Sequence, residues 1–200
     1  MNLLAQSWYA RDVVQVARDL LGMQLRRGSV VLRITEVEAY LGPQDSACHT
    51  SKGRTPRNAA MWGPPGHAYV YVCYGMHQML NVVAGLQCGS AVLIRSCEPF
   101  QGHATIRRRR GAIVGPALLA GPGRVGQGLA LNTSFSGQPL FEPGGLELLQ
   151  GLPPRAIAVG RRVGIDSARP RDVKALLRFA DADSPWVSHR GRLGASSRGL

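Results

Sequence analysis

The chain has 200 residues, of which 44% are hydrophobic and 18% charged, a composition that is typical of one folded domain and excludes a disordered chain. Its formal charge of +12 favours a polyanionic partner, most simply nucleic acid. A genome of high GC content would by itself replace lysine with arginine, but it would not explain the excess of basic over acidic residues. Because the sequence has no apolar run of about 18 residues and no secretory signal, we expect neither a membrane span nor secretion.

The first half of the chain predicts a helix followed by a hairpin. Apolar residues between Asp12 and Leu21 recur at helical spacing, and Gly22 ends the run. QLRR, a Gly28-Ser29 turn and VVLRITEVEAYLG then predict a hairpin with a long second strand. Residues 42–67 are rich in Gly, Pro, Ser and Arg and have no periodicity. We expect them to form a long ordered loop, and such loops are usually functional.

The second half of the chain predicts further strands with short connections. AYVYVCY, QMLNVVAG and SAVLIRS predict three strands, LELL, AIAVG and VKALLRFA predict three more, and 113–121 and 122–131 predict short helices. We expect Arg107–Arg110 to be solvated and 189–200 to be a flexible basic tail. Since short turns replace crossover helices, we expect the α+β (mixed) class, as one domain over residues 1–200. A curved antiparallel β-sheet would be flanked by short helices and carry a protruding β-hairpin.

The ITEVEAY strand carries the first candidate chemistry. Side chains alternate along a strand, so Glu36, Glu38 and Tyr40 share one face, while Val37 and Ala39 can join the core on the other. Charged residues are mostly exposed, and a solvated outer face is the simpler interpretation of an arbitrary strand. This strand, however, runs directly into the long polar loop. The position favours a site in which a glutamate acts as a general base beside a flat phenol ring.

Three other residues stand out by their position in the pattern. His49 lies in the polar loop, where a structural hydrogen bond and a stacking role are both open. Arg95 ends the apolar strand VLIR, and Asn81 lies inside an apolar strand where a polar amide must find partners. A surface arginine and an amide that ties down a loop remain alternatives for these two.

The stretch YVYVCYGM holds three tyrosines within eight positions. Alternation places Tyr69 and Tyr71 on one face and Tyr74 on the other, provided that the strand stays regular up to Gly75. The stretch therefore predicts a hairpin whose tyrosines have two different roles.

Several separated motifs resemble one known family, in the same order. EVEAYLGPQDSACH, GRTPRNAAMWGPPGHAYVYVCYGMHQMLNVV and AVLIRSCEP are similar to the alkyladenine DNA glycosylases, also called 3-methyladenine or methylpurine DNA glycosylases. The likeness continues in AGPGRVGQGLAL, RRVGI and SPWVS, so it covers most of the chain. It implies a hydrolase that flips damaged purines, whether alkylated, deaminated or etheno adducts, out of duplex DNA. The enzyme would then cut the N-glycosidic bond in base excision repair.

The resemblance also implies roles for single residues. Glu38 matches the general base that activates the attacking water, and Arg95 and the backbone of Val163 match groups that hold the water or the glutamate. The positions of the base-binding pocket correspond to Tyr40, His49, Tyr71 and Asn81, of which Asn81 would screen against the amino group of guanine. Tyr74 matches the wedge that enters the base stack. The DNA-contacting positions correspond to Tyr74, Gly75, Met76, Met61, Thr55, Arg57 and Arg124.

The expected partner is damaged double-stranded DNA, bound by a monomer, with no membrane and no metal or organic cofactor. The four cysteines, Cys48, Cys73, Cys88 and Cys97, form no CxxC pair and are expected to be small buried apolar residues. A lyase step needs an amine nucleophile, and Lys52 is the only lysine near the proposed site, so a monofunctional enzyme is expected. The compartment would be cytoplasmic and nucleoid-associated in a bacterium, or nuclear in a eukaryote. A non-catalytic basic nucleic-acid-binding module and an RNA-binding pseudo-enzyme remain open.

Overall fold

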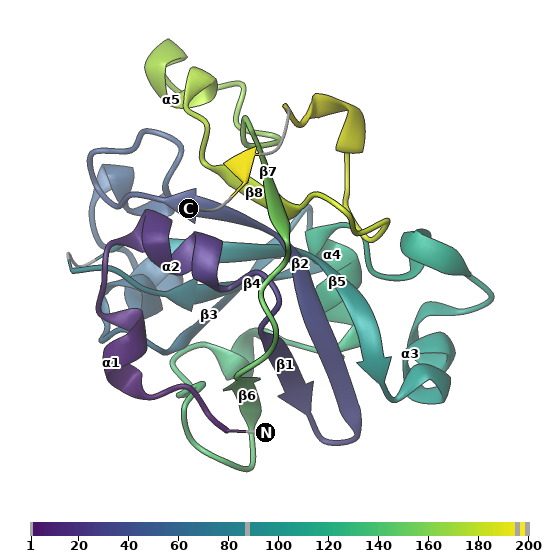
Figure 1. Cartoon of the computed structure of the whole chain (residues 1–200). Helices are drawn as coiled ribbons and strands as arrows, with labels where there is room; N and C mark the ends of the chain where they lie inside the picture. The colour runs from purple at the N-terminus through teal and green to yellow at the C-terminus, as the bar shows by residue number, and fades with distance from the viewer. Residues whose placement is uncertain (1, 87–88, 195–196, 199–200) are drawn as a thin grey trace.

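The computed structural model describes residues 2–86, 89–194 and 197–198, and a nine-stranded sheet forms its centre (Figure 1). The strands are β1 (Gln24–Arg27), β2 (Val30–Tyr40), β3 (Ala68–Cys73), β4 (His77–Val83), β5 (Ala91–Gln101), β6 (Leu146–Leu149), β7 (Ala156–Gly160), β8 (Arg178–Asp181) and β9 (Ser197–Arg198). Seven of them follow the order β3-β4-β5-β2-β8-β7-β9, and β1 pairs with both β2 and β6. These strand pairs are antiparallel.

Short helices surround the sheet. The α-helices are α1 (Gln6–Tyr9), α2 (Val13–Asp19), α3 (His103–Arg110), α4 (Pro122–Gly128) and α5 (Pro170–Lys174). The 3-10 helices are η1 (His49–Lys52), η2 (Pro56–Trp62), η3 (Gly115–Leu118), η4 (Thr133–Phe135) and η5 (Arg190–Arg192). An antiparallel sheet with short helices confirms the predicted α+β class.

Helix α2 lies in front of the sheet in Figure 1 and covers one of its faces. It begins at Asp12, whose side chain accepts hydrogen bonds at 3.0 Å from the backbone N–H groups of Val14 and Gln15. The buried side of α2 belongs to the same core cluster as Val37 and Ala39 of β2, which are fully buried. Both the predicted helix and the predicted inward direction of these two residues are therefore confirmed.

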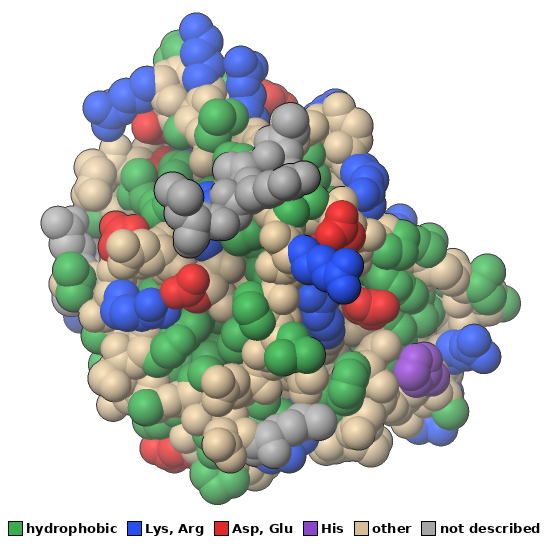
Figure 2. Space-filling view, in the orientation of Figure 1, with side chains coloured by type: hydrophobic (Ala, Val, Ile, Leu, Met, Phe, Trp, Pro, Cys, Tyr) green, Lys and Arg blue, Asp and Glu red, His purple; other side chains and the backbone are tan. Residues whose placement is uncertain are grey.

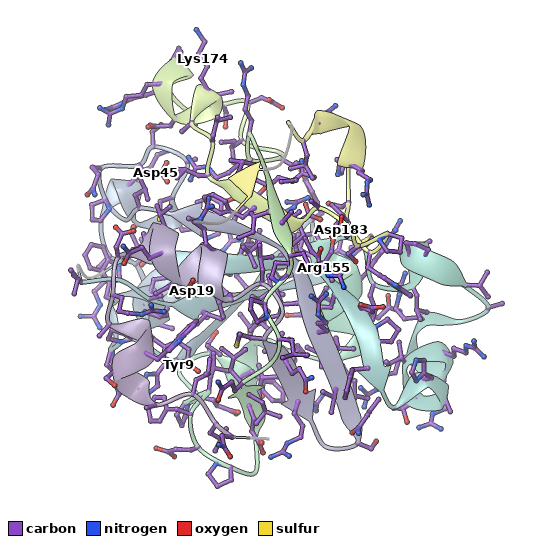
Figure 3. The ribbon with its side chains drawn as sticks, viewed as in Figure 1. Tyr9, Asp19, Asp45, Arg155, Lys174 and Asp183 are labelled. Carbon is purple, nitrogen blue, oxygen red and sulfur yellow. The ribbon has the colours of Figure 1, made fainter. Side chains whose placement is uncertain are left out.

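Basic and acidic side chains lie next to one another on the face that is drawn in Figure 2. Arg11 pairs with Asp19 at the end of α2 at 2.9 Å, and Asp19 is labelled in Figure 3. Arg33 of β2 pairs with Asp181 of β8 at 2.8 Å. These pairs offset positive charge on the α2 face.

Segment 42–67 covers the opposite face of the sheet and contains η1 and η2, which the sequence does not predict. At the start of η2, the Thr55 side chain accepts a hydrogen bond from the backbone N–H of Asn58 at 3.3 Å, and the Asn58 side chain accepts one from the backbone N–H of Thr55 at 2.7 Å. Pro56 occupies the first helical position. Capping contacts form this helix, and for that reason apolar periodicity does not reveal it.

The run Arg107–Arg110 is only partly solvated, so this prediction is wrong in part. The four arginines form the C-terminal half of helix α3, because arginine is a good helix former and Ile106 anchors the helix in the core. Arg107 and Arg108 are exposed, whereas Arg109 donates to the carbonyl of Gly128 at 2.7 Å. Arg110 similarly donates to the carbonyl of Leu118 at 2.8 Å.

The last third of the chain differs from the predicted elements in detail. VKALLRFA is a strand only over β8, because Pro170 starts the short helix α5 just before it and α5 takes up the first residues. Of the predicted tail 189–200, the structure describes Arg190–Arg192 as η5 and pairs Ser197–Arg198 with β7. The tail as a whole stays a prediction, since 195–196 and 199–200 lie outside the described residues. In the part of the chain that the structure describes, no helix is long and apolar enough to cross a membrane.

Candidate active site

A cavity of about 480 Å³ opens on the face of the sheet away from α2. Strand alternation produces it: β3, β4 and β5 each send one set of side chains into the α2 core and the other set toward the cavity. The loop with η1 and a segment after β7 complete the wall. The lining residues are Tyr40, Ala47, Cys48, His49, Arg57, Met61, Tyr69, Tyr71, Cys73, Tyr74, Met79, Asn81, Leu93, Arg95, Pro122, Val163, Gly164 and Ile165.

Glu38 lies fully buried beneath this wall and touches three of the lining residues. Its Oε1 accepts a hydrogen bond from the backbone N–H of Val163 at 2.7 Å and lies 3.1 Å from a terminal nitrogen of Arg95. Its Oε2 accepts a hydrogen bond from the hydroxyl of Tyr40 at 3.0 Å. Burial raises the pKa of Glu38, and the Arg95 charge and these two hydrogen bonds oppose the rise only in part. The structure thus brings together Glu38, Arg95 and Val163, which are distant in sequence.

Glu36, two residues earlier, is also fully buried and is held by five donors. Its Oε1 accepts from Nε of Arg95 and Nε of Arg178, both at 2.8 Å, and from the hydroxyl of Ser188 at 2.9 Å. Its Oε2 accepts from the hydroxyl of Ser96 and the backbone N–H of Ser188, both at 2.6 Å. Although burial acts to raise it, the pKa of Glu36 is lowered, because the charges of Arg95 and Arg178 and the hydrogen bonds from Ser96 and Ser188 together outweigh the loss of water.

Arg95 joins the two carboxylates and is itself almost fully buried. The interpretation of ITEVEAY as a solvated outer face is therefore wrong, as is a surface position for Arg95. Sequence reasoning missed the three residues that complete this network, Ser96, Arg178 and Ser188. For Arg178 a signal exists, because LLRFA places an arginine inside an apolar strand just as VLIR does for Arg95. Ser188 has no such signal, since its position depends on the path of the chain after β8.

Aromatic rings form the walls of the cavity. The rings of Tyr69 and Tyr71 stack with centroids 5.5 Å apart, so their predicted common face is confirmed. His49 packs edge-on against Tyr71 at 4.5 Å, and its Nδ1 lies 2.9 Å from the hydroxyl of Tyr69. Burial and the nearby Arg57 charge lower the pKa of His49, so the imidazole is neutral at pH 7. Tyr69 is thus both a buried residue and a hydrogen-bond partner in the site.

Tyr40 and Asn81 occupy fixed positions in the same cavity. The guanidinium of Arg162 lies 4.7 Å from the centre of the Tyr40 ring, and Arg162 is in turn held by Asp45. Burial and the Glu38 charge raise the pKa of Tyr40 well above its ordinary value, so its hydroxyl keeps its proton. The amide nitrogen of Asn81 donates to the carbonyl of Tyr69 at 3.2 Å.

The tip of the β3–β4 hairpin projects into solvent. Tyr74 is 89% exposed and Met76 71% exposed, and Gly75 between them is exposed as well. Tyr74 and Gly75 have φ angles of +51° and +70°. The prediction that Tyr74 faces away from Tyr71 is wrong, because β3 ends at Cys73 and the left-handed turn brings Tyr74 to the edge of the same cavity.

The remaining predicted DNA-contacting residues have different surroundings. Met61 is buried in the cavity wall, while Thr55 caps η2 on the surface. Arg57 donates to the carbonyl of Val72 at 2.9 Å, which fixes it beside the hairpin. Arg124 is exposed on α4 and donates to the carbonyl of Ala120 at 3.0 Å.

The cysteines form no site of their own within the described residues. Cys48 and Cys97 are buried as expected, whereas Cys73 is only half-buried, and all three are free thiols. Cys88 lies outside the described residues. Over residues 2–86, 89–194 and 197–198 there is no group of three or more His, Cys, Asp or Glu side chains that would hold a metal ion.

Comparison with known proteins matches nearly the whole chain. The family model of the methylpurine-DNA glycosylases matches residues 7–185. A DNA-3-methyladenine glycosylase of Arabidopsis thaliana is 56% identical over 191 residues, which cover 94% of this chain and 75% of that protein. A Nitrosococcus oceani protein, provisionally named a 3-methyladenine DNA glycosylase, is 52% identical over 193 residues that cover 96% of each chain. A Rhizobium meliloti protein with the same provisional name is 47% identical, over 92% of this chain and 95% of that protein.

These matches define the class of protein first: a hydrolase that acts on N-glycosyl bonds in DNA repair. Within that class, the chain belongs to the methylpurine-DNA glycosylase family. The resemblance seen in the motifs is thereby confirmed.

Proposed function

We propose that this chain is a monofunctional DNA glycosylase that acts as a monomer on damaged double-stranded DNA. It flips an alkylated, deaminated or etheno-adducted purine out of the base stack, and Glu38 activates the water that hydrolyses the N-glycosidic bond. The product is an abasic site for base excision repair. The observation that carries the proposal is a buried carboxylate directly beneath a cavity walled by aromatic rings. In a bacterial cell the enzyme would work at the nucleoid, and in a eukaryotic cell in the nucleus.

The surroundings of Glu38 suit a general base. An ionised carboxylate has about four lone-pair sites, and Val163, Arg95 and Tyr40 engage three of them. The fourth is free for a water molecule, from which Glu38 takes a proton while positive charge develops on the sugar. The charge of Arg95 favours the ionised form of Glu38 and opposes part of the rise in its pKa that burial causes. Burial raises the pKa of Glu38 and so makes it a stronger base than a carboxylate in water.

The cavity suits an extruded purine. Duplex DNA hides the glycosidic bond, so the nucleotide must rotate out at a cost of a few kcal/mol, which is smaller for a damaged base. Stacking on Tyr40, Tyr71 and His49 would return about 1–3 kcal/mol. An alkylated purine is cationic and gains further from the electron-rich tyrosine faces. The amide of Asn81 is held by Tyr69, so its oxygen can read the edge of the purine.

Tyr74 suits the role of a wedge. A non-glycine residue at positive φ costs on the order of 1 kcal/mol or more, and it persists where function requires it. Packing does not compensate for this cost at Tyr74, since the side chain is almost fully exposed. An exposed ring at the cavity edge can enter the base stack and occupy the space that the flipped nucleotide leaves.

The chemistry stops at an abasic site in this proposal. A lyase step would need an amine nucleophile in the cavity. Among the cavity-lining residues that the structure describes there is no lysine, and Lys52 is exposed on η1.

The test is base release from labelled duplexes that carry hypoxanthine or ethenoadenine. We expect release by the wild type and by Glu98→Gln, a matched control at an exposed glutamate of β5, and none by Glu38→Gln, which still binds the duplex. Release by Glu38→Gln at the wild-type rate would remove Glu38 from the chemistry. Binding by the wild type without release would favour the non-catalytic module, and a strong preference for single-stranded RNA in competition would favour the RNA-binding protein.

A further inference from the structure

A second groove lies at the far end of α4 from the cavity. It has a volume of about 570 Å³ and is lined by residues from the β1–β2 turn, α3 and the segment around η4, namely Arg27, Gly28, Ser29, Arg109, Phe135, Gln138, Gly144 and Gly145. The β1–β2 turn and α3 contact each other at the lower right of Figure 1. We refer to this second groove as the Arg27–Arg109 groove.

The hydrogen bonds that hold the two arginines of this groove go to backbone carbonyl groups. Arg109 donates to the carbonyl of Gly128, and Arg27 donates to the next two carbonyls, of Leu129 and Ala130. These contacts use one terminal nitrogen of each guanidinium and place both charges beside consecutive peptide groups. The remaining N–H groups can bind a ligand in the groove. The Arg27 guanidinium also lies 4.6 Å from the ring centre of Phe135, which further fixes its orientation.

The positive charge of the groove is not balanced by the protein. Among the described residues, no carboxylate forms an ion pair with Arg27, Arg108 or Arg109. The nearby Glu147 is engaged by Arg26 and by the backbone N–H of Gly144, so it does not neutralise the groove. Burial, and then the charges of Arg27 and Arg108, lower the pKa of Arg109, as expected for neighbouring unpaired cations. Such a cluster fits an anion.

The groove continues the surface of the hairpin. A neighbouring groove of about 650 Å³ is lined by Arg57, Gly75, Thr133 and Ser136 among others. The segment around η4 separates the two grooves and contributes to both. Ser136 fixes this segment to β3, because its hydroxyl accepts a hydrogen bond from the N–H of Val70 and donates to the carbonyl of the same residue, both at 2.8 Å. Two adjoining grooves, with Arg57 in the first and Arg27 and Arg109 in the second, therefore lead away from the hairpin tip.

The length of α4 gives the distance between cavity and groove. Pro122 at the start of α4 lines the cavity, and Gly128 at its end binds Arg109. At 1.5 Å per residue, this helix is about 10 Å long. Successive phosphates of one DNA strand advance by about 3.4 Å along the duplex axis, so a duplex that lies parallel to α4 would bring a phosphate about three nucleotides from the flipped base to the groove.

We propose that the Arg27–Arg109 groove binds the phosphate backbone of the duplex about three nucleotides to one side of the lesion. The two guanidinium groups and the Ser29 hydroxyl donate to a phosphodiester, a geometry that suits arginine. This contact carries no base information and sets the register of the duplex on the hairpin. This proposal rests on the proposed function, because it requires the duplex to bind with its lesion at the cavity.

The test measures binding to a duplex with a tetrahydrofuran abasic-site analogue, which cannot be cleaved, as a function of salt concentration. The variants are Arg27→Gln/Arg109→Gln and the matched control Arg155→Gln, an exposed arginine on the face drawn in Figure 3. Each lost phosphate contact should reduce the slope of log K against log salt by about 1 and weaken binding about tenfold at 0.1 M salt. We expect this loss for the double variant and wild-type behaviour for the control. An unchanged slope in the double variant would overturn the proposal.

A second measurement separates this contact from a structural effect on α4 by comparing the wild type with the double variant on modified duplexes. Single methylphosphonate groups, which are uncharged, replace phosphates at each position up to six nucleotides from the analogue. Weakening that peaks about three nucleotides away, and that disappears in the double variant, supports the groove. Equal weakening of wild type and double variant at that position would refute it. These binding results do not depend on base release, so a protein that releases no base would count against the proposed function and not against the groove.

Discussion

Replacing Glu36 by glutamine should mainly lower the stability of the protein, whereas replacing Glu38 by glutamine should mainly lower its activity. Glu36 and Glu38 lie two residues apart, and both are fully buried on the same network. Glutamine keeps the shape of the side chain and one carbonyl oxygen, and it replaces the other oxygen with an amide that only donates. The outcome therefore depends on which groups surround each carboxylate.

At Glu36 the substitution should be strongly destabilising. Five donors point at the carboxylate, including the buried guanidinium groups of Arg95 and Arg178. A glutamine amide would face two N–H or O–H donors on the Oε2 side, and Arg178 would lose its only carboxylate partner among the described residues. Breaking a buried ion pair from one side costs about 3–5 kcal/mol. We expect Glu36→Gln to lower the free energy of unfolding by that amount.

At Glu38 the substitution should be close to neutral for the fold. The retained carbonyl can still accept from Val163 and face Arg95, and the hydroxyl of Tyr40 can turn to accept from the new amide. The pKa of Glu38 is raised, which means that its ionised form is less favourable in the folded than in the unfolded chain. Removing the charge should leave the free energy of unfolding unchanged or higher, within about 1 kcal/mol. Excision should fall by at least about 10²-fold, the contribution of a general base.

The assay combines urea unfolding at pH 7 with single-turnover excision of hypoxanthine at saturating enzyme. Glu98→Gln on β5 serves as the exposed control in both measurements. The reasoning would be refuted if Glu36→Gln were no less stable than Glu38→Gln, because the difference in their partners would then have no energetic consequence. Strong destabilisation by Glu38→Gln would likewise show that its ionised form stabilises the fold.

Three further predictions follow from single features of the site. Burial raises the pKa of Glu38 above the ordinary 4.5, whereas the charges and hydrogen bonds around Glu36 together overcome burial and lower its pKa. As the pH is lowered, the excision rate should therefore begin to fall while the pH is still above 4.5, whereas the stability that Glu36 contributes is lost only below pH 4.5. Acid unfolding is measured by near-UV circular dichroism. A pH–rate profile that coincides with the acid-unfolding curve would contradict this prediction. Tyr74→Gly should relieve the left-handed strain and raise the free energy of unfolding by up to about 1 kcal/mol, yet weaken binding of a lesion duplex at least tenfold; equal binding would exclude a wedge. Asn81→Ser should increase release of methylguanine relative to methyladenine, and an unchanged ratio would assign the screening to another residue.

The sequence predicts the strands well because alternation is a local property. Val37 and Ala39 enter the α2 core, and Tyr69 and Tyr71 share a face, as their parity requires. Parity fails at Tyr74 because a left-handed turn ends the strand at Cys73, and φ angles cannot be read from side-chain type. The helices η2 and α3 are missed for a similar reason. Capping contacts and arginine-rich helix ends form them, and neither leaves an apolar period.

The chemistry of the site is predicted less completely, because the partners of each glutamate come from distant parts of the chain. Local pattern places Glu36 and Glu38 on one face but treats them as equivalent. Arg178 and the backbone of Ser188 reach Glu36 from more than 140 positions away in sequence, and the backbone of Val163 reaches Glu38 from 125 positions away. Only folding decides which carboxylate receives two guanidinium groups.

That asymmetry suggests why the site contains two carboxylates and not one. A lone buried glutamate beside Arg95 could form a close bidentate pair, which would lower its pKa and weaken it as a base. Glu36 binds the Nε of Arg95 and leaves a terminal nitrogen to contact Glu38 at 3.1 Å. Arg178 and Ser188 fix Glu36 in this position, so Arg95 cannot turn fully toward Glu38. In the proposed mechanism Glu36 thereby acts as a positioning residue: it limits the contact between Arg95 and Glu38, and its own charge also raises the pKa of Glu38, so that Glu38 stays basic enough to take a proton from water.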